Sequence, residues 1–304
     1  MEGLGRGVDV VREPIVNAIQ KQRTLLRVAA GKNPTAALKL ARSYGFDRPK
    51  DFHQEVKWYR RAAELGNLEA QNLLGECYRD GHGVRRNLKQ GIKLLSLAAK
   101  RGEPNAQTSI GYQLFYGEHI KRDRTKAILW YRKAAAQGQV NALSNLGLSY
   151  GAGQGVGRDY RESIKWFRKA AAQNHARSMF WIGHAFWWGQ GVKENLRRAF
   201  DWFRKAAHYG DAEASTYVGV CFHDGLSVKR NFKKAVKHYR LALKEDPYAQ
   251  YCLGLCYRDG EGVKRNRRLS LLWLKKAAAN GEPDAINTLK RFAKNNTFAK
   301  TNHR

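Results

Sequence analysis

Small and apolar residues recur along the chain in stretches of helical spacing, and these stretches repeat with a fixed period. One glycine in the middle of such a stretch recurs every 36 residues, at Gly75, Gly111, Gly147, Gly183 and Gly219, and Gly254 follows after 35. A second series keeps the same step and resumes near the end of the chain, at Gly66, Gly102, Gly138, Asn174, Gly210 and Gly281. Asn fits this series because, like Gly, it tolerates the left-handed conformation that ends many helices. The fixed period predicts a repeat protein.

Each repeat is predicted to begin with a helix, called helix A here, such as Ala70-Gln-Asn-Leu-Leu-Gly75-Glu-Cys-Tyr78. A glycine inside a helix costs about 1 kcal/mol relative to alanine. Its recurrence therefore indicates a packing site, where a neighbouring helix comes too close for a side chain. Counting in steps of 36 places Lys39 and Lys290 at the same position near the two ends, which predicts capping of the array there.

A second helix, helix B, is predicted to begin after a residue that is Asp or Asn in every repeat. These residues cap helices because their side chains accept hydrogen bonds from free backbone amides. The series is Asp51, Asn87, Asp123, Asp159, Asn195, Asn231 and Asn266. Inside helix B, a tryptophan recurs four residues before an Ala-Ala pair, so a large side chain is expected to pack against small ones. These tryptophans are Trp58, Trp130, Trp166, Trp202 and Trp273.

Together the patterns predict an all-α fold, a right-handed α-solenoid superhelix of about seven 36-residue helix-turn-helix repeats with terminal capping helices. We expect an N-terminal capping segment at residues 1–32, the repeats at 33–283, and a C-terminal capping helix with a polar tail at 284–304. Within the first segment, Pro14 suits a first helical turn, and apolar residues follow it. This helix either caps the array or binds a partner.

The chain is strongly basic, with 56 Lys and Arg against 26 Asp and Glu and a net charge of +30. Basic residues fall just before each helix B cap, so stacking would align them in a ridge of loops. The candidates are Arg85, Arg86, Lys121, Arg122, Arg158, Lys229, Arg230, Lys264 and Arg265. Such a ridge suits a phosphate backbone, because neutralised phosphates release counterions. The alternative interpretation is a solvated loop face, which we favour for any single residue.

Other classes of chemistry lack their motifs in this sequence. No Walker A loop, HExxH zinc site or nucleophile elbow is present, so we expect no enzyme, no catalytic residue, no cofactor and no metal. Cys77, Cys221, Cys252 and Cys256 show neither a disulfide framework nor a CxxC pattern. Neither a secretory signal nor an apolar run of the roughly 20 residues needed to span a membrane is present. A soluble, cytoplasmic protein is expected, with nuclear entry and a specialised secretion route left open.

The repeat resembles a known family, the Sel-1-like repeats, which are relatives of tetratricopeptide units. The matching elements are the helix A run at residues 142–150, the loop Gly153-Gln-Gly155-Val156, and the helix B segment Trp166-Phe-Arg-Lys-Ala170-Ala171. Pentatricopeptide RNA binders have a similar length but would not explain the Gly-x-Gly-Val loop. The resemblance implies an adaptor or scaffold that assembles complexes. A cysteine-rich secreted branch is linked to β-lactam binding, but this chain lacks its paired cysteines.

By analogy with tetratricopeptide units, helix A lines a concave groove. Contact residues are then expected three before, one after and four after the packing glycine. The candidates chosen from these positions are Tyr112, Phe115, Phe180, His184, Trp187, His223, Tyr251 and Arg258. The fifth repeat is unusually aromatic, which is typical of a binding hot spot. In the alternative interpretation, Phe186 fills a core site while Trp181 and Trp188 pack between hairpins.

The sequence thus predicts a non-catalytic protein–protein interaction adaptor that binds a peptide or protein segment, of acidic character, in the concave groove. The alternative is a repeat protein that binds nucleic acid or another polyanion through the basic loop ridge. A steep linear loss of affinity with the logarithm of salt concentration would favour that alternative. No membrane span is expected, and the oligomeric state is left open.

Overall fold

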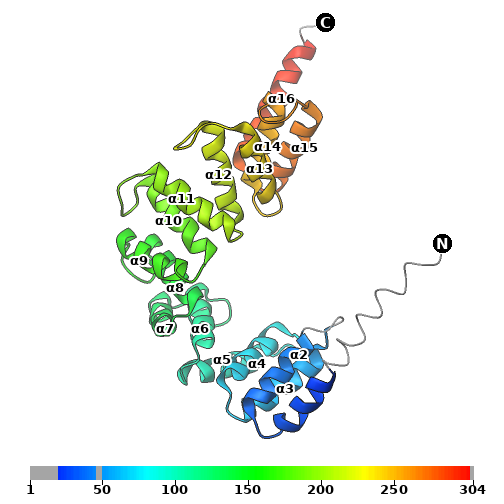
Figure 1. Ribbon diagram of the computed structural model, residues 1–304, viewed down its shortest axis with the longest axis vertical. Helices are drawn as coiled ribbons and strands as arrows, with labels where there is room; N and C mark the ends of the chain where they lie inside the picture. The colour runs from blue at the N-terminus through cyan, green and yellow to red at the C-terminus, as the bar shows by residue number, and fades with distance from the viewer. Residues whose placement is uncertain (1–19, 46–49, 302–304) are drawn as a thin grey trace, which may run out of the picture. The chain divides into compact units, whose positions relative to one another are not determined.

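The computed structural model describes residues 20–45 and 50–301, with side chains as far as Phe292. Its helices alternate along the chain as pairs, which confirms the predicted all-α solenoid of helical hairpins (Figure 1). The A helices are α2 (Pro34–Gly45), α4 (Leu68–Asp80), α6 (Pro104–Tyr116), α8 (Val140–Ala152), α10 (Ala176–Trp188), α12 (Ala212–Asp224), α14 (Pro247–Asp259) and α16 (Pro283–Thr301). The B helices are α3 (Phe52–Glu64), α5 (Leu88–Lys100), α7 (Arg124–Ala136), α9 (Tyr160–Ala171), α11 (Leu196–His208), α13 (Phe232–Ala242) and α15 (Arg267–Ala279).

The helices form two units, Met1–Ala142 and Leu143–Arg304, called unit 1 and unit 2 here. Within each unit the same packing recurs. A helix A contacts the helix B of its own repeat, as α10 contacts α11, and that helix B contacts the next helix A, as α11 contacts α12. Inside a unit, a hairpin therefore buries its apolar faces against the adjacent hairpins, as expected of a solenoid.

The predicted caps of helix B are all confirmed. In each of the seven B helices, the predicted Asp or Asn accepts a hydrogen bond from the backbone amide three residues further along the chain. The A helices are capped too, by a more varied set that the sequence analysis did not single out. These caps are Asn67, Glu103, Gln139, His175, Asp211 and Asp246. The first five directly follow members of the second glycine series, which is the signal that could have revealed them.

The packing glycines lie where the prediction placed them, against the helix B of the same repeat. A Cβ built on Gly183 would lie 2.7 Å from the Phe203 ring, and one built on Gly219 would lie 2.5 Å from the Tyr239 ring. Phe203 and Tyr239 are buried inside their hairpins. The glycine thus makes room for a large helix B side chain, which stands one residue after the position of the recurring tryptophan.

The prediction that Lys39 occupies the packing-glycine position of the first repeat was wrong. Because α2 begins 34 residues before α4, and not 36, the residue that replaces the packing glycine in the first repeat is Ala41. Ala41 is fully buried, whereas Lys39 is exposed on the opposite side of α2. At the other end the count of 36 holds, and Lys290 is exposed on α16.

Part of the expected N-terminal helix is present. Residues 20–30 are helical, Ala30 is buried, and Leu26 packs against the core of the first repeat. Arg27 also donates a hydrogen bond to the hydroxyl of Tyr44 on α2. Pro14 lies outside the described residues. The described part of this segment covers the first hairpin, as a capping helix would.

Candidate functional site

The accessible side chains of the A helices follow a stripe that differs from the predicted set. Relative to the packing glycine, the accessible positions lie six and two residues before it, and one and five residues after it. In α10 these positions are Arg177, Trp181, His184 and Trp188. This spacing of four, three and four residues describes one face of an α-helix. We call this face of the A helices the open stripe.

The predicted position three residues before the glycine is buried in most repeats, so that part of the groove prediction was wrong. Phe180 is only 2% exposed, and Asn72, Thr108, Ser144 and Thr216 are also buried. At about 100° per residue, three residues back along a helix lies only about 60° from the glycine. That position therefore faces the hairpin core together with the glycine.

The remaining predicted groove residues differ in accessibility. Tyr112 is exposed, Phe115 is only 8% exposed, and His184, Trp187, His223, Tyr251 and Arg258 are partly buried. Phe115 is a core side chain because its ring packs against Tyr116 and Tyr131. The position one residue after the glycine, which includes Tyr112 and His184, belongs to the open stripe. The structure therefore keeps these two residues on the accessible face.

The aromatic side chains of the fifth repeat divide into a core group and an accessible group. Trp187 contacts the rings of Phe203 and Tyr217 at centroid distances of 5.8 and 5.5 Å, so it packs between α10, α11 and α12. Trp188, which the alternative interpretation placed between hairpins, is 59% exposed. His184 lies between Trp181 and Trp188, 5.4 and 6.2 Å from their ring centroids. The accessible group on α10 is thus two tryptophans that flank a histidine.

A cavity of ≈ 280 Å³ opens beside this group, between α8, α9 and α10. Leu148, Gly151 and Ala152 of α8 form one wall, and Trp181 and His184 of α10 form the opposite wall. The space is open because Gly151 has no side chain and Ala152 has only a methyl group. A Cβ built on Gly151 would have only the Ser163 side chain within 4 Å. Apolar and aromatic walls with a few polar groups are typical of ligand sites.

Two polar groups at this cavity have distinct properties. The indole Nε1 of Trp181 is buried and, like those of Trp58 and Trp166, has no hydrogen-bond partner among the described residues. Burial lowers the pKa of His184 below its ordinary value, against the opposing effects of Glu213 and of a hydrogen bond with Gln190. Burial therefore favours the neutral form of His184. The cavity combines this imidazole with aromatic and apolar walls.

His223 has a structural role in the structure. Its Nδ1 lies 2.6 Å from Oδ1 of Asp224, and its Nε2 lies 2.8 Å from Oε2 of Glu261 in the loop of the next repeat. Burial tends to lower the pKa of His223, but the hydrogen bonds and charges of the two carboxylates outweigh it and raise the pKa above its ordinary value. The structure thus gives His223 two carboxylate partners, one on its own helix and one in the next repeat. At the equivalent positions, Arg79 and Arg258 form ion pairs with the following aspartate.

We expect the stability contributed by His223 to depend on pH. Because its pKa is raised in the folded state, the contribution is fully present below the unfolded value of about 6.5 and is lost as the pH rises through the folded value. The pKa of His175, His184 and His238 is lowered, so these residues act in the opposite sense. Urea unfolding of the protein and of His223→Gln should therefore be compared. The stability difference should shrink from pH 6 toward pH 8 by less than about 1 kcal/mol, because the pair is partly exposed. A difference that is constant with pH would contradict the ion pairs.

The basic loop residues are all exposed, as the ridge requires. Several of them also pack within their own loops. The Cβ atoms of Arg122 and Arg158 lie against the glycines that end the preceding A helices, and Nε of Arg86 donates a hydrogen bond to the carbonyl of Arg79. These contacts support the interpretation of a solvated loop face for part of the series.

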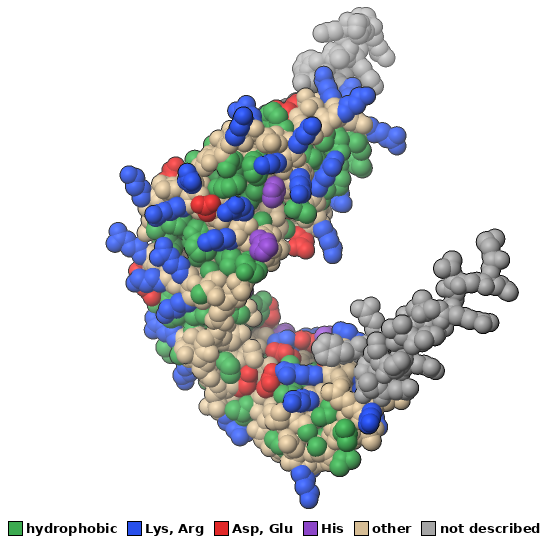
Figure 2. All heavy atoms as spheres, in the orientation of Figure 1, with side chains coloured by type: hydrophobic (Ala, Val, Ile, Leu, Met, Phe, Trp, Pro, Cys, Tyr) green, Lys and Arg blue, Asp and Glu red, His purple; other side chains and the backbone are tan. Residues whose placement is uncertain are grey.

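The larger concentration of charge, which the sequence analysis missed, lies on the B helices. From α5 to α15 these six helices contain 23 Lys and Arg but only two Asp and Glu. The six A helices from α4 to α14 contain three Lys and Arg and six Asp and Glu. Figure 2 shows many more Lys and Arg than Asp and Glu side chains on the surface. Sorting the charges by helix type would have revealed the asymmetry from the sequence.

Two further searches concern metals and membranes. Among the described residues, no group of three His, Cys, Asp or Glu side chains is placed to hold a metal ion. The described helices also include none that is both long and apolar enough to cross a membrane.

Comparisons with known proteins agree with this architecture. The model of the family described as "Sel1 repeat" matches residues 34–67, 68–103, 104–139, 140–175, 176–211, 212–246 and 247–282. A Sel1 repeat protein from Oxalobacter formigenes has 31% identity and a TM-score of 0.69, over 91% of this chain and 81% of that one. A protective antigen of uropathogenic Escherichia coli strains, which displays an SLR fold, has 29% identity and a TM-score of 0.73 over 88% of this chain. The match spans 57% of the length of that antigen.

Proposed function

This chain belongs to the Sel1 repeat family, and from this premise we propose that it is a non-catalytic adaptor that binds a peptide or protein segment on the open stripe of unit 2. The observation that carries the proposal is the cavity between α8 and α10, where the Trp181 ring and His184 lie opposite the apolar wall formed by Leu148 and Ala152. An extended segment would place an apolar side chain in the cavity, against the Trp181 ring. A scaffold in a reducing compartment, such as the cytoplasm, is part of the proposal, since the four cysteines are free.

The open stripe provides mainly apolar contacts for such a segment. Leu148 of α8 is 38% exposed, Trp188 of α10 is more exposed, and Tyr217 and Val220 continue the stripe on α12. Charges on this face are few and partly paired, as Nη2 of Arg177 lies 2.8 Å from Oε1 of Glu213. Aromatic anchors in partly enclosed sites carry much of the affinity of protein interfaces. Recognition should therefore depend on an apolar anchor more than on acidity of the partner.

A selection from a library of random peptides on the immobilised full chain tests this function. We expect the recovered peptides to share a large apolar residue, and their affinity to change little between low and high salt, because the open stripe of unit 2 is nearly neutral. Recovery of uniformly acidic peptides whose binding disappears at high salt would instead assign binding to the basic surfaces and would contradict the proposal.

A further inference from the structure

The B helices present cations in a regular arrangement that the proposed function does not use. In four of them a lysine lies three residues after the recurring tryptophan of helix B, and its ammonium group lies over the tryptophan ring. The Nζ-to-centroid distances are 4.7 Å for Lys133 on Trp130, 4.2 Å for Lys169 on Trp166, 4.7 Å for Lys205 on Trp202 and 5.2 Å for Lys276 on Trp273. Cation–π contacts of this kind are worth about 0.5–1 kcal/mol at exposed sites. They hold the ammonium groups close to aromatic rings along the surface of the B helices.

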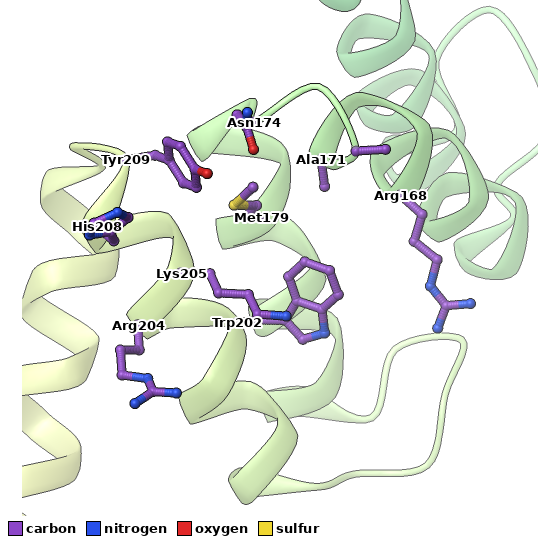
Figure 3. Close-up of a pocket in the computed structure, with 10 residues that line it drawn as sticks. Arg168, Ala171, Asn174, Met179, Trp202, Arg204, Lys205, His208 and Tyr209 are labelled. Atoms are coloured by element: carbon purple, nitrogen blue, oxygen red, sulfur yellow. The ribbon is translucent and has the colours of Figure 1, made fainter.

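One of these pairs lies at a cavity of ≈ 760 Å³ between α9 and α11. In Figure 3, Trp202 and Lys205 extend from α11 into the cavity, and Arg168 extends from α9 on the other side. Tyr209, at the end of α11, is 47% exposed and belongs to the same lining. The ten lining residues include Arg168, Arg204 and Lys205 but no Asp or Glu. Arg204 has only a distant acidic neighbour, since its Nη2 lies 3.9 Å from Oδ1 of Asp201.

We propose that this cavity and the basic surface of the B helices in unit 2 bind single-stranded nucleic acid, with phosphates on Arg168, Arg204 and Lys205 and a base against the exposed ring of Tyr209. Charge complementarity points to a polyanion, because α9, α11, α13 and α15 contain 16 Lys and Arg and two Asp and Glu. A basic groove beside an exposed aromatic ring, here Tyr209, is the combination that binds single strands, whose unpaired bases can stack.

The same observations disfavour two other polyanions. In a duplex the faces of the bases are stacked inside. Its phosphates would therefore contact the Lys and Arg side chains, but its bases would not stack on the aromatic side chain. An anionic membrane would need a continuous apolar strip to insert, whereas the exposed leucines of these helices, Leu241 and Leu272, stand singly on α13 and α15. The ligand with the best match is therefore a flexible chain of phosphates and planar rings.

The first test measures the binding of fluorescent oligouridylate and oligoadenylate to the full chain by anisotropy over a range of salt concentrations. The variant Arg168→Ala/Arg204→Ala/Lys205→Ala is compared with the control Lys193→Ala/Lys229→Ala/Arg230→Ala. Both variants remove three exposed positive charges from unit 2. We expect the cavity variant to bind at least about tenfold more weakly and to show a salt slope smaller by roughly 2, at about 0.7 per phosphate contact on single strands. The affinity of the control variant should fall by less than about threefold. Equal losses in both variants would overturn the proposal.

A second variant separates stacking from charge. Tyr209→Ala changes no charge and alters an exposed side chain, so folding should be intact by circular dichroism. We expect it to bind oligoadenylate about fivefold to tenfold more weakly with an unchanged salt slope, and to leave binding of heparin unchanged. Unchanged affinity for oligoadenylate, or equally tight binding of the protein to heparin, to duplex RNA and to the oligonucleotides, would show that the surface is a general polyanion binder and would overturn the proposal.

Discussion

Replacement of Gly219 by valine should lower the free energy of unfolding of unit 2 by about 2–3 kcal/mol, the upper range for an overpacked core. A Cβ at this position would lie 2.5 Å from Cε1 of Tyr239 and 3.3 Å from the backbone carbonyl of Ala235. The Tyr239 ring is only 2% exposed, so it cannot move away without disturbing α12 and α13. The gain in helix propensity from losing a glycine is smaller than this cost.

The matched control is Gly157→Val. No described atom lies within 4 Å of a Cβ built at Gly157, and its backbone is outside the left-handed region. This variant should change the stability by no more than about 0.5 kcal/mol. Urea unfolding followed by circular dichroism compares the two variants with the unchanged protein. Equal effects of the two substitutions would mean that Gly219 is not a packing site.

The second large effect is expected at the open stripe. Trp181→Ala should weaken the binding of a library-selected peptide about 30-fold, equivalent to about 2 kcal/mol, because it removes the aromatic wall of the cavity. Trp181→Phe retains a smaller aromatic wall, so we expect a smaller loss of affinity of about fivefold. Isothermal titration calorimetry with the same peptide measures each affinity.

Two further variants make this prediction decisive. Trp188 is largely exposed, so Trp188→Ala should fold normally and still bind the peptide more weakly. Leu272, 56% exposed on α15, is an equally accessible apolar side chain on a B helix. Leu272→Ala should leave the affinity unchanged. If Leu272→Ala lowers the affinity for the peptide as much as Trp188→Ala does, the peptide does not bind on the open stripe.

The caps and packing glycines could be predicted because each repeat imposes the same local demand at the same position. A helix B needs a side-chain acceptor at its first turn, which only a few residue types provide, and Asp51 and Asn266 meet this demand as directly as the internal caps do. The packing glycine is visible for a similar reason, since a residue that disfavours helices recurs inside one.

The accessible face could not be predicted by analogy alone. The positions borrowed from tetratricopeptide units put Phe180 in the groove, but the angle between that position and Gly183 turns its side chain into the core. The first repeat is two residues shorter than the others, so counting in steps of 36 assigned the packing-glycine position to Lys39 when it belongs to Ala41. The cavity beside Trp181 depends on three helices of two repeats, so no single repeat reveals it.

The central claim is that the open stripe of unit 2 is the surface that grips a partner segment. Photo-crosslinking tests it most directly, with a selected peptide whose anchoring side chain is replaced by a benzophenone and with mass spectrometry to locate the bond. We expect crosslinks to α8 and α10, concentrated at Leu148, Trp181 and Trp188, and their loss when unlabelled peptide competes. Crosslinks concentrated on the B helices α9, α11, α13 or α15 would contradict the claim.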